Sequence, residues 1–418
     1  MEQNKTYQGN ALTVLKTFPE KYFHCCVTSP PYYGLRSYQT EPQVWDEKFV
    51  CIHEWSKEII ATNSGGGWFD PEKRKNYEHQ RLKNPKKEKQ NKVSQGCFCK
   101  KCRAWKGELG LEPTPELYLK HLLQIFTEVK RVLRKDGTLF VNLGDKTDNK
   151  GMLQLPHRFS IMMVDELKFI LRRNIIWHKP GIMPTSQKDN FSLDYEDVFF
   201  FTKSQKYYFE QPLEEAMYDG RKDTMFKGSK KYDNPNISPD GAVNTFAKEG
   251  HERWMEVNGK KMRIMRSVWR IPSEAITENH YATYPQKLVE RIIKYACPEE
   301  VCNKCEKPKL KTYKGASQSA FNIRVRDVKK KRIKHSDRRA SKEEVDNYKE
   351  SYGDGRTEEI IVCNCNAGFH PGVVLDPFIG SGTTGIVARK LNRSYVGIDL
   401  TYHQLNEDRQ NKELGFFR

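Results

Sequence analysis

The sequence lacks any apolar run approaching the roughly 18 residues that a membrane-spanning helix requires. Its first residues show no basic stretch followed by an apolar one, so we expect no secretory signal and a cytoplasmic location. Internal repeats are also absent. Acidic residues are too few to balance the basic ones: 54 Asp and Glu against 72 Lys and Arg leave a formal net charge of +18. A positive excess of this size predicts a polyanionic partner, most often nucleic acid, and no membrane.

The eleven cysteines occur without a secretory signal, so disulfide bonds are a poor explanation for them. Most of them cluster with the spacing of metal ligands. The two sets are Cys51, His53, Cys99 and Cys102, and Cys302, Cys305, Cys363 and Cys365. Sets of four ligands predict two closed structural zinc sites, each closing a polar insertion. Cys97 and Cys297 are alternative ligands, and scattered reduced cysteines are the alternative to both sites.

Strands alternate with helices over the more regular parts of the chain, which predicts an α/β fold with a mostly parallel sheet. Thr114 and Pro115 have the residue types that begin a helix. The expected strands are 23–28, 138–144, 174–177, 197–202, 373–376 and 395–399. Residues 56–96, 211–270 and 306–360 are polar and lack periodicity, so we expect them to be excursions from the fold.

A glycine-rich turn follows the expected strand at 373–376. Gly380, Gly382 and Gly385 match the dinucleotide-binding spacing GxGxxG, and Asp399 ends the next strand, where an acid can hold ribose hydroxyls. This pattern predicts an adenosine-containing ligand. Few residues follow the turn, so the other strands of the sheet must come from earlier in the chain. That order counts against a nicotinamide oxidoreductase, and an ordinary strand-to-helix turn is the other alternative.

A second turn, Thr28-Ser29-Pro30-Pro31-Tyr32, ends the expected strand at 23–28. Its two prolines remove two backbone donors, so the turn can present the Pro30 carbonyl and the Ser29 side chain to an exocyclic amino group. Tyr32 can stack on a base that has been rotated out of a duplex. A strand-ending turn with core tyrosines is the alternative.

The order of these motifs resembles that of the amino-DNA methyltransferases in their permuted arrangement, in which the catalytic motif precedes the cofactor motif. TSPPY (28–32) is similar to the catalytic motif, DPFIGSGTT (376–384) to the S-adenosylmethionine motif, and HYATYPQKLVERII (280–293) to the motif that flanks the cofactor. The resemblance implies a Rossmann-like, circularly permuted methyltransferase sheet of α/β class with zinc-bound insertions. It also implies methyl transfer from S-adenosylmethionine to an exocyclic amine of double-stranded DNA, in a prokaryotic or viral protein.

The resemblance implies a role for individual residues. Ser29 and the Pro30 carbonyl would bind the target amine, Pro31 would complete the turn, and Tyr32 would stack on the base. The expected cofactor residues are Asn10, Thr28, His280, Pro285, Asp376, Pro377, Phe378, Gly380, Gly382, Thr383, Thr384 and Asp399. Asn10 stands where the family often has an acid.

Ser29 also bears on the target base. In this family Ser at the first motif position is associated mostly with cytosine N4 and Asp with adenine N6, so we expect a cytosine-N4 methyltransferase, with adenine N6 as the alternative. A partner restriction endonuclease would act separately. A non-catalytic zinc nucleic-acid-binding protein, methylation of a protein amide and an RNA substrate are further alternatives.

The expected domain organisation follows these motifs. Residues 1–50 and 103–210 form the catalytic half, 51–102 the first zinc insertion, 211–275 the target recognition region, and 276–418 the cofactor half with a second zinc insertion at 302–365. Trp254 and Trp269 alternate with Lys and Arg in the recognition region, which suits base and phosphate contacts. Basic runs at 83–92 and 324–342 predict nonspecific phosphate contacts that weaken with salt.

Overall fold

The computed structural model describes residues 1–34, 37, 40–47, 50–63, 91–182, 188–215, 255–257, 260–274, 284–314 and 357–415. The chain divides into two compact units. The first comprises Met1–Phe209, Ser267–Pro308 and Cys365–Arg418, and the second comprises Glu210–Arg266 and Lys309–Asn364. Both units are therefore assembled from segments that are far apart in the sequence.

An eight-stranded mixed sheet forms the centre of the first unit, with the strand order β1-β22-β21-β2-β8-β12-β11-β16. The strands are β1 (Lys5–Gln8), β22 (Ser394–Asp399), β21 (Val373–Asp376), β2 (Phe23–Thr28), β8 (Leu133–Leu143), β12 (Tyr195–Thr202), β11 (Ile170–His178) and β16 (Val268–Arg270). The first five in this order are parallel, β12 is antiparallel to both of its neighbours, and β16 is parallel to β11. The expected α/β class is confirmed, with strands from both ends of the chain paired side by side.

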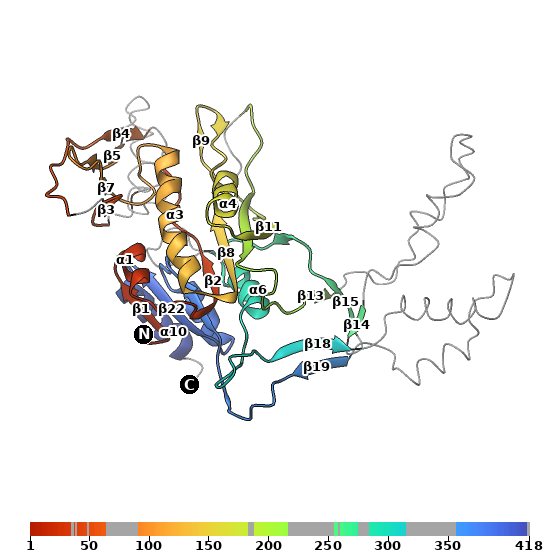
Figure 1. Cartoon of the computed structure of the whole chain (residues 1–418). Coiled ribbons are helices and arrows are strands. Elements are labelled where there is room, and N and C mark those ends of the chain that lie inside the picture. The colour runs from red at the N-terminus through yellow and green to blue at the C-terminus, as the bar shows by residue number, and fades with distance from the viewer. Residues whose placement is uncertain are drawn as a thin grey trace, which may run out of the picture. The chain divides into compact units, whose positions relative to one another are not determined.

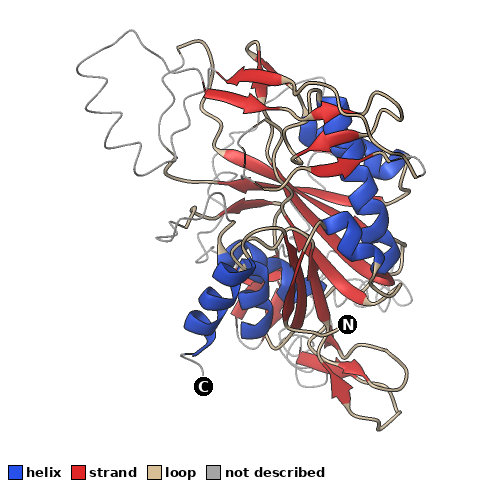
Figure 2. Cartoon of the chain, turned by 90° about the vertical axis from the view of Figure 1, so that its left-hand side faces the viewer, coloured by secondary structure: helices blue, strands red, loops and turns tan. Residues whose placement is uncertain are grey.

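Helices cover both faces of this sheet (Figures 1 and 2). One group is α1 (Ala11–Lys16), α3 (Pro115–Val132) and α4 (Leu155–Asp165), and the other is α6 (Gln286–Ala296), α9 (Thr383–Lys390) and α10 (His403–Gly415). Side chains of β8 alternate between the two layers: Leu139 and Val141 join the core beneath α3, whereas Phe140 and Asn142 face α6.

The longest helix of the first group, α3, begins as its sequence predicts. The Thr114 hydroxyl accepts a hydrogen bond from the Leu117 amide at 3.3 Å, and Pro115 occupies the first turn. Tyr118, Leu122 and Val129 are fully buried along one face. This face packs on the sheet and fixes the position of the helix over β2 and β8.

One strand is longer than its sequence indicates. The sequence predicts a strand at 174–177, but β11 runs from Ile170 to His178 because it pairs with β12 along most of its length, with an irregularity between Leu171 and Arg173. The alternation of side chains is broken there, so the local pattern carries no strand signal. Pairing with a neighbouring strand, rather than local preference, sets the length of β11.

A small antiparallel sheet, β3 (Gln43–Trp45), β7 (Trp105–Gly107) and β6 (Cys97–Phe98), follows the Ser-Pro-Pro turn in the first unit. It is anchored on α3 by the fully buried His121, whose ring stacks between Trp45 and Trp105 at centroid distances of 4.8 and 5.2 Å. His121 Nδ1 lies 2.9 Å from Glu112 Oε1. This small sheet is therefore packed onto the core of the first unit.

Shorter pairings complete the two units. In the first unit β4 (Ile60–Asn63) pairs with β5 (Asn91–Ser94), β9 (Thr147–Asp148) with β10 (Gly151–Met152), and β17 (Val301–Cys302) with β20 (Phe369–His370). The second unit contains β13 (Leu213–Glu215), β15 (Lys260–Ile264) and β14 (Met255–Val257), and the hairpin of β18 (Leu310–Lys314) and β19 (Thr357–Ile361). Among the helices that the structure describes, none is both long and apolar enough to cross a membrane.

Candidate active site

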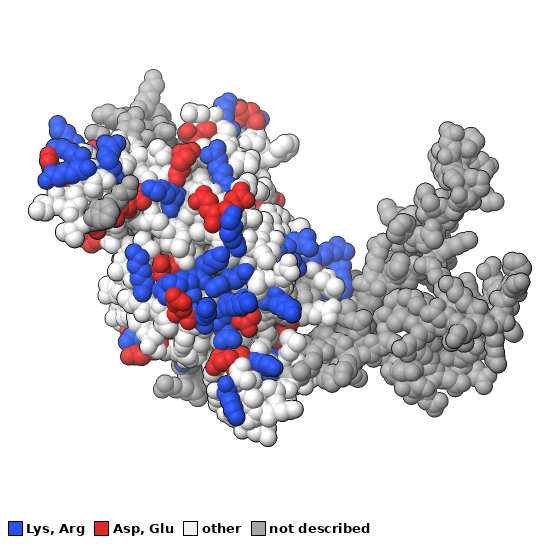
Figure 3. Space-filling model, viewed as in Figure 1, with Lys and Arg blue, Asp and Glu red and all other residues white. Residues whose placement is uncertain are grey.

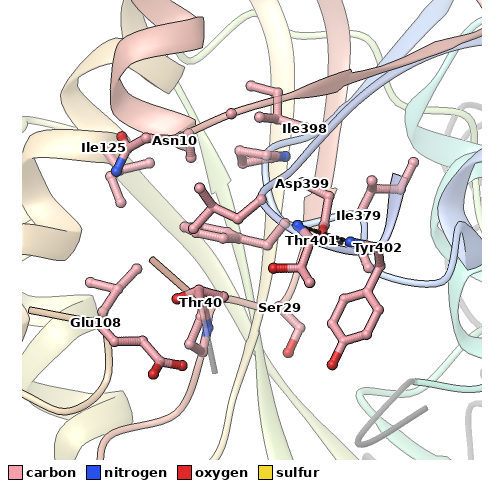
Figure 4. Close-up of a pocket in the computed structure, with 18 of the residues that line it drawn as sticks. Asn10, Ser29, Thr40, Glu108, Ile125, Ile379, Ile398, Asp399, Thr401 and Tyr402 are labelled. Carbon is pink, nitrogen blue, oxygen red and sulfur yellow. Dashed lines mark hydrogen bonds between the residues drawn. The ribbon is translucent and has the colours of Figure 1, made fainter. Parts of the chain in front are cut away.

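A pocket lies at the carboxyl ends of the parallel strands β2, β21 and β22. Residues 377–381 and Thr383 of the glycine-rich turn contribute much of its lining, and Ser29 and Pro31 of the proline turn also line it. In Figure 4, Asn10, Thr40, Glu108 and Ile125 lie on one side of the pocket, and Ile379, Asp399, Thr401 and Tyr402 lie on the other. The parallel pairing of β2 with β21 brings the two predicted motifs together, because the carboxyl ends of parallel neighbours meet at the same edge of the sheet.

Asp399 ends β22 and points to the pocket. Its Oδ1 accepts hydrogen bonds from the amides of Thr401 (2.8 Å) and Tyr402 (2.6 Å), and its Oδ2 accepts one from the Gly380 amide (3.1 Å). Three backbone donors therefore fix the carboxylate at the pocket wall. A fixed carboxylate beside the apolar side chains of Phe378 and Ile398 suits an adenosine, whose ribose offers hydroxyl donors and whose base offers an apolar face.

The glycine-rich turn is held from behind by α10. Asn406 Nδ2 donates to the Gly380 carbonyl at 3.1 Å, and Arg409 Nη1 donates to the hydroxyls of Ser381 (2.8 Å) and Thr383 (3.0 Å). Gly382 has a φ of 87°, and a Cβ at this position would lie 2.8 Å from Asn406 Oδ1. Glycine is required there both by the backbone conformation and by the close approach of α10.

A buried carboxylate connects the two motifs below the pocket. Asp376 Oδ1 accepts from the Thr28 hydroxyl (2.7 Å) and the Phe378 amide (3.1 Å), and Oδ2 accepts from the hydroxyls of Thr384 (2.6 Å) and Tyr284 (2.8 Å). Burial raises the pKa of Asp376, and the Thr384, Thr28 and Tyr284 hydrogen bonds oppose this rise. Thr28, Asp376 and Thr384 therefore organise the two turns from beneath.

The proline turn is held by side chains of α3 and β12 and by the backbone that follows β8. Tyr118 of α3 donates to the Pro31 carbonyl at 2.8 Å, which leaves the Pro30 carbonyl as the expected acceptor for an amine. Tyr32 donates to Glu196 Oε2 at 2.8 Å, and Ser29 Oγ donates to the Tyr32 oxygen at 3.3 Å. Gly144 follows β8, and a Cβ on it would lie 2.5 Å from the Tyr32 ring. The ring of Tyr32 is thus fixed at its hydroxyl and along one edge.

The remaining predicted residues are placed as follows. Pro285 lies at the N-cap of α6, and His280 and Trp254 fall outside the described residues. Trp269 is 8% exposed within β16, where it pairs with Trp177, so its aromatic ring belongs to the first unit's fold. The basic run at 324–342 and nearly all of the run at 83–92 also lie outside the described residues.

The first metal-ligand set is assembled in the insertion. The ligand atoms of Cys51, His53, Cys99 and Cys102 all lie within 4.8 Å of one another. His53 Nδ1 lies 3.4 Å from Cys102 Sγ, while His53 Nε2 lies 3.1 Å from Glu47 Oε1. A carboxylate at one ring nitrogen fixes the proton there and leaves the other nitrogen free to ligate, as in zinc sites with an outer carboxylate.

The four cysteines of the second metal-ligand set are distributed over the two compact units. Cys302, Cys305 and Cys365 belong to the first unit, and their sulfur atoms lie within 4.8 Å of one another. Cys363, the fourth expected ligand, belongs to the second unit. Within the described part of the chain, Cys97 and Cys297 belong to neither set.

Basic side chains gather around the lower end of α3 in the view of Figure 3. This end is the carboxyl end of the helix, where Lys130 and Arg131 occupy the last turn and the Tyr22 amide donates to the Val132 carbonyl at 2.7 Å. It therefore lies at the amino end of β2, whereas Ser29 follows the carboxyl end of that strand. The basic side chains on this face therefore do not mark the edge of the sheet at which the pocket lies.

Three residues of the site, Glu196, Asn406 and Arg409, carried no local sequence signal, whereas Tyr284 lies within the motif at 280–293. Tyr284, Glu196, Asn406 and Arg409 contact the two motifs from positions far along the chain. Arg409 and Asn406 lie in a polar final helix whose composition resembles that of an exposed one. Glu196 stands at the start of β12, whose residues from Asp197 onward are continuously buried, so no alternation marked its side chain.

Comparison with known proteins places these features in a family. A family model described as "DNA methylase", of the N6/N4 type, matches residues 23–304 and 300–407. The chain is 24% identical over 435 residues to the type II methyltransferase M.XycI of Xanthomonas campestris pv. cyanopsidis, covering 96% of this chain and 86% of that protein. It is 22% identical over 427 residues to the type II methyltransferase M.Cfr9I of Citrobacter freundii, covering 94% and 82%. The solved PvuII DNA methyltransferase (cytosine-N4-specific) aligns over 99% of this chain and 95% of that chain, with 14% identity and a TM-score of 0.45.

Proposed function

The chain belongs to the N6/N4 DNA methylase family and is an S-adenosylmethionine-dependent DNA methyltransferase, and we propose that its target is the exocyclic N4 of cytosine in double-stranded DNA. The observation that carries this proposal is Ser29, the serine of the Ser-Pro-Pro-Tyr turn, at a pocket that is also lined by Asp399. Its motif order supports the circularly permuted arrangement, because the proline turn precedes the glycine-rich turn in the chain while the two meet in space.

The pocket residues suit the cofactor. Asp399 would bind the ribose hydroxyls, Phe378 and Ile398 would contact the adenine, and the backbone of the glycine-rich turn would approach the rest of the molecule closely. Bound there, S-adenosylmethionine supplies a methyl group made electrophilic by its sulfonium sulfur. A covalent cysteine intermediate is not needed for an amine target, and burial raises the pKa of Cys25, just before the proline turn, to about 12.

The residues of the proline turn would prepare the amine. Its nitrogen is a poor nucleophile because the lone pair is delocalised into the ring of the base. Acceptors at Ser29 Oγ and the Pro30 carbonyl would hold the two amine hydrogens and direct the lone pair toward the methyl group. Tyr32 would stack on the extruded base and hold it in place. In this proposal, positioning of the reactants and fixed dipoles would supply most of the catalysis.

Adenine N6 is the second candidate target, because the family includes enzymes of both kinds. The type II names of the relatives support a role in restriction and modification, with a partner endonuclease that acts separately. The deciding experiment incubates the protein with S-adenosylmethionine and unmethylated genomic DNA and identifies the product nucleosides by mass spectrometry. We expect N4-methylcytosine; N6-methyladenine would overturn the base assignment and keep the family mechanism. The absence of both, with the cofactor bound, would direct the search to RNA or to a silent binding protein.

Structural zinc is proposed at both cysteine sets. In the first set, four ligand atoms converge from residues 51–53 and 99–102, and the Glu47 carboxylate faces the His53 ring nitrogen that would not ligate. The second set has three converging thiols in the first unit and Cys363 close by in the sequence. Sets of four protein ligands leave no open position on a zinc ion, so the metal would serve the fold.

Replacement of Gly382 by alanine tests the support of the cofactor turn. Its φ of 87° and the proximity of Asn406 mean that a Cβ would push α10 away from the turn. We expect S-adenosylmethionine to bind about tenfold more weakly or worse, since such strain costs roughly 1–3 kcal/mol. Isothermal titration calorimetry measures the change in affinity.

Gly181→Ala is the matched control for that variant. Gly181 has a similar φ of 80°, but nothing lies within 4 Å of a Cβ built there. It shares the backbone strain without the collision, so its affinity for the cofactor should equal that of the unmodified protein. If Gly382→Ala bound S-adenosylmethionine as tightly as Gly181→Ala, α10 would not be needed to support the turn.

A further inference from the structure

Glu196 lies beside the catalytic turn, although it belongs to neither sequence motif. It is the second residue of β12, which runs antiparallel to β8, so the beginning of β12 reaches the edge of the sheet where the proline turn lies. Its side chain is 18% exposed. A carboxylate so nearly enclosed must be satisfied by specific partners.

The partners of this carboxylate are all donors. Oε2 accepts from the Tyr32 hydroxyl at 2.8 Å and from Asn142 Nδ2 at 3.0 Å. Oε1 pairs with the ammonium of Lys179, which is 20% exposed. An ionised carboxylate can only accept hydrogen bonds, so every group that faces it must donate.

This requirement fixes the direction of a short chain of hydroxyls. A tyrosine has a single hydroxyl proton, and Tyr32 gives it to Glu196. Its oxygen can then only accept, and Ser29 Oγ donates to it at 3.3 Å. The one proton of Ser29 is thereby directed away from the pocket, and the lone pairs of Ser29 Oγ are left for a ligand.

We propose that Glu196, paired with Lys179, is a positioning residue that sets the hydrogen-bond direction of Tyr32 and Ser29, so that Ser29 presents an acceptor to the target amine. The inference rests on the proposed function, because an amine offers hydrogens and needs an acceptor. An aspartate would be an acceptor without help, whereas a serine hydroxyl can act either way. Glu196 therefore determines that Ser29 acts as an acceptor, and not as a donor, toward the target amine.

Glu196→Gln tests this arrangement with little change in shape. The side-chain amide of the glutamine has only one accepting oxygen. We expect this oxygen to face Lys179, because a hydrogen bond from an ammonium group is stronger than one from a neutral donor. The amide nitrogen then faces Tyr32, which must accept from it and donate to Ser29. Ser29 would in turn direct its proton into the pocket, toward an amine that is also a donor.

We expect Glu196→Gln to lower kcat for DNA methylation by about 10- to 100-fold, the range for a mismatched polar contact in an enclosed site. The affinity for S-adenosylmethionine should not change, because the contacts of Glu196 are to Tyr32, Asn142 and Lys179 and not to the glycine-rich turn or Asp399. Asp194→Asn is the matched control. Asp194 lies two residues earlier, pairs with His178 at 3.4 Å, and should tolerate the same change with unaltered kcat.

Tyr32→Phe provides an independent test, since it keeps the ring and removes only the link between Ser29 and Glu196. We expect a loss of kcat similar to that of Glu196→Gln, and no further loss when the two changes are combined. Full activity of Tyr32→Phe, additive losses in the double variant, or a Glu196→Gln variant as active as Asp194→Asn would each overturn the inference. Methylation of DNA by the unmodified protein is measured first, so a failure of the proposed function is recognised separately.

Discussion

Tyr32→Ala is expected to reduce DNA methylation by about 100-fold or more, while S-adenosylmethionine binds as it does to the unmodified protein. Stacking on an extruded base contributes roughly 1–3 kcal/mol, and the alanine also removes the hydroxyl that connects Ser29 to Glu196. Asp399 and Phe378, for which cofactor contacts are proposed, line the pocket, whereas Tyr32 is not one of its lining residues.

Single-turnover methylation and calorimetric titration of the cofactor separate these two effects. Tyr22→Ala is a suitable control. Tyr22 directly precedes β2, whereas Tyr32 follows the opposite end of that strand, and the Tyr22 hydroxyl accepts a hydrogen bond from Gln3 Nε2 at 2.6 Å. That variant loses an aromatic side chain of the same kind but should methylate DNA at the normal rate. Unchanged turnover of Tyr32→Ala would remove Tyr32 from the base pocket.

Removal of zinc is the second change with a large expected effect. We expect chelation to release about two zinc ions per chain and to lower the melting temperature by roughly 10 °C or more, because closed four-ligand sites stabilise segments that have little core of their own. In the first insertion the ligand Cys99 directly follows β6, which pairs with β7; β7 pairs with β3, and Gln43 and Trp45 of β3 line the pocket. Weaker cofactor binding should therefore accompany the loss of stability.

Cys99→Ala and Cys97→Ala form a matched pair for the first site. Both cysteines are buried in or next to β6, two residues apart, but only Cys99 belongs to the ligand set. Cys99→Ala should lose one zinc ion and melt at a lower temperature, whereas Cys97→Ala should retain both ions. A metal-free protein as stable as the purified one, measured by elemental analysis and thermal melting, would refute the zinc assignment.

Local chemistry explains what could be predicted from the sequence. The prolines after Thr28 and the glycines after Asp376 impose their turns wherever they stand, so their residue types indicated a catalytic and a cofactor turn. Thr114 capped α3 as expected, and the strand at 23–28 has the bounds that its apolar run predicted. The cysteine spacing likewise identified the first set, whose candidate ligand atoms lie within 4.8 Å of one another.

What the sequence by itself determined is therefore the α/β class and the two turns, since each depends on residue types at short spacing. Only the tertiary structure decided which side chains serve those turns. Glu196 reaches Tyr32, and Arg409 and Asn406 reach the glycine-rich turn, because strand pairing and helix packing join residues that are distant in the chain. The same pairing buried Trp269 within β16, although its basic surroundings indicated a DNA contact. The burial of a side chain and the direction of its hydrogen bonds depend on these distant neighbours, so a local sequence pattern cannot predict them.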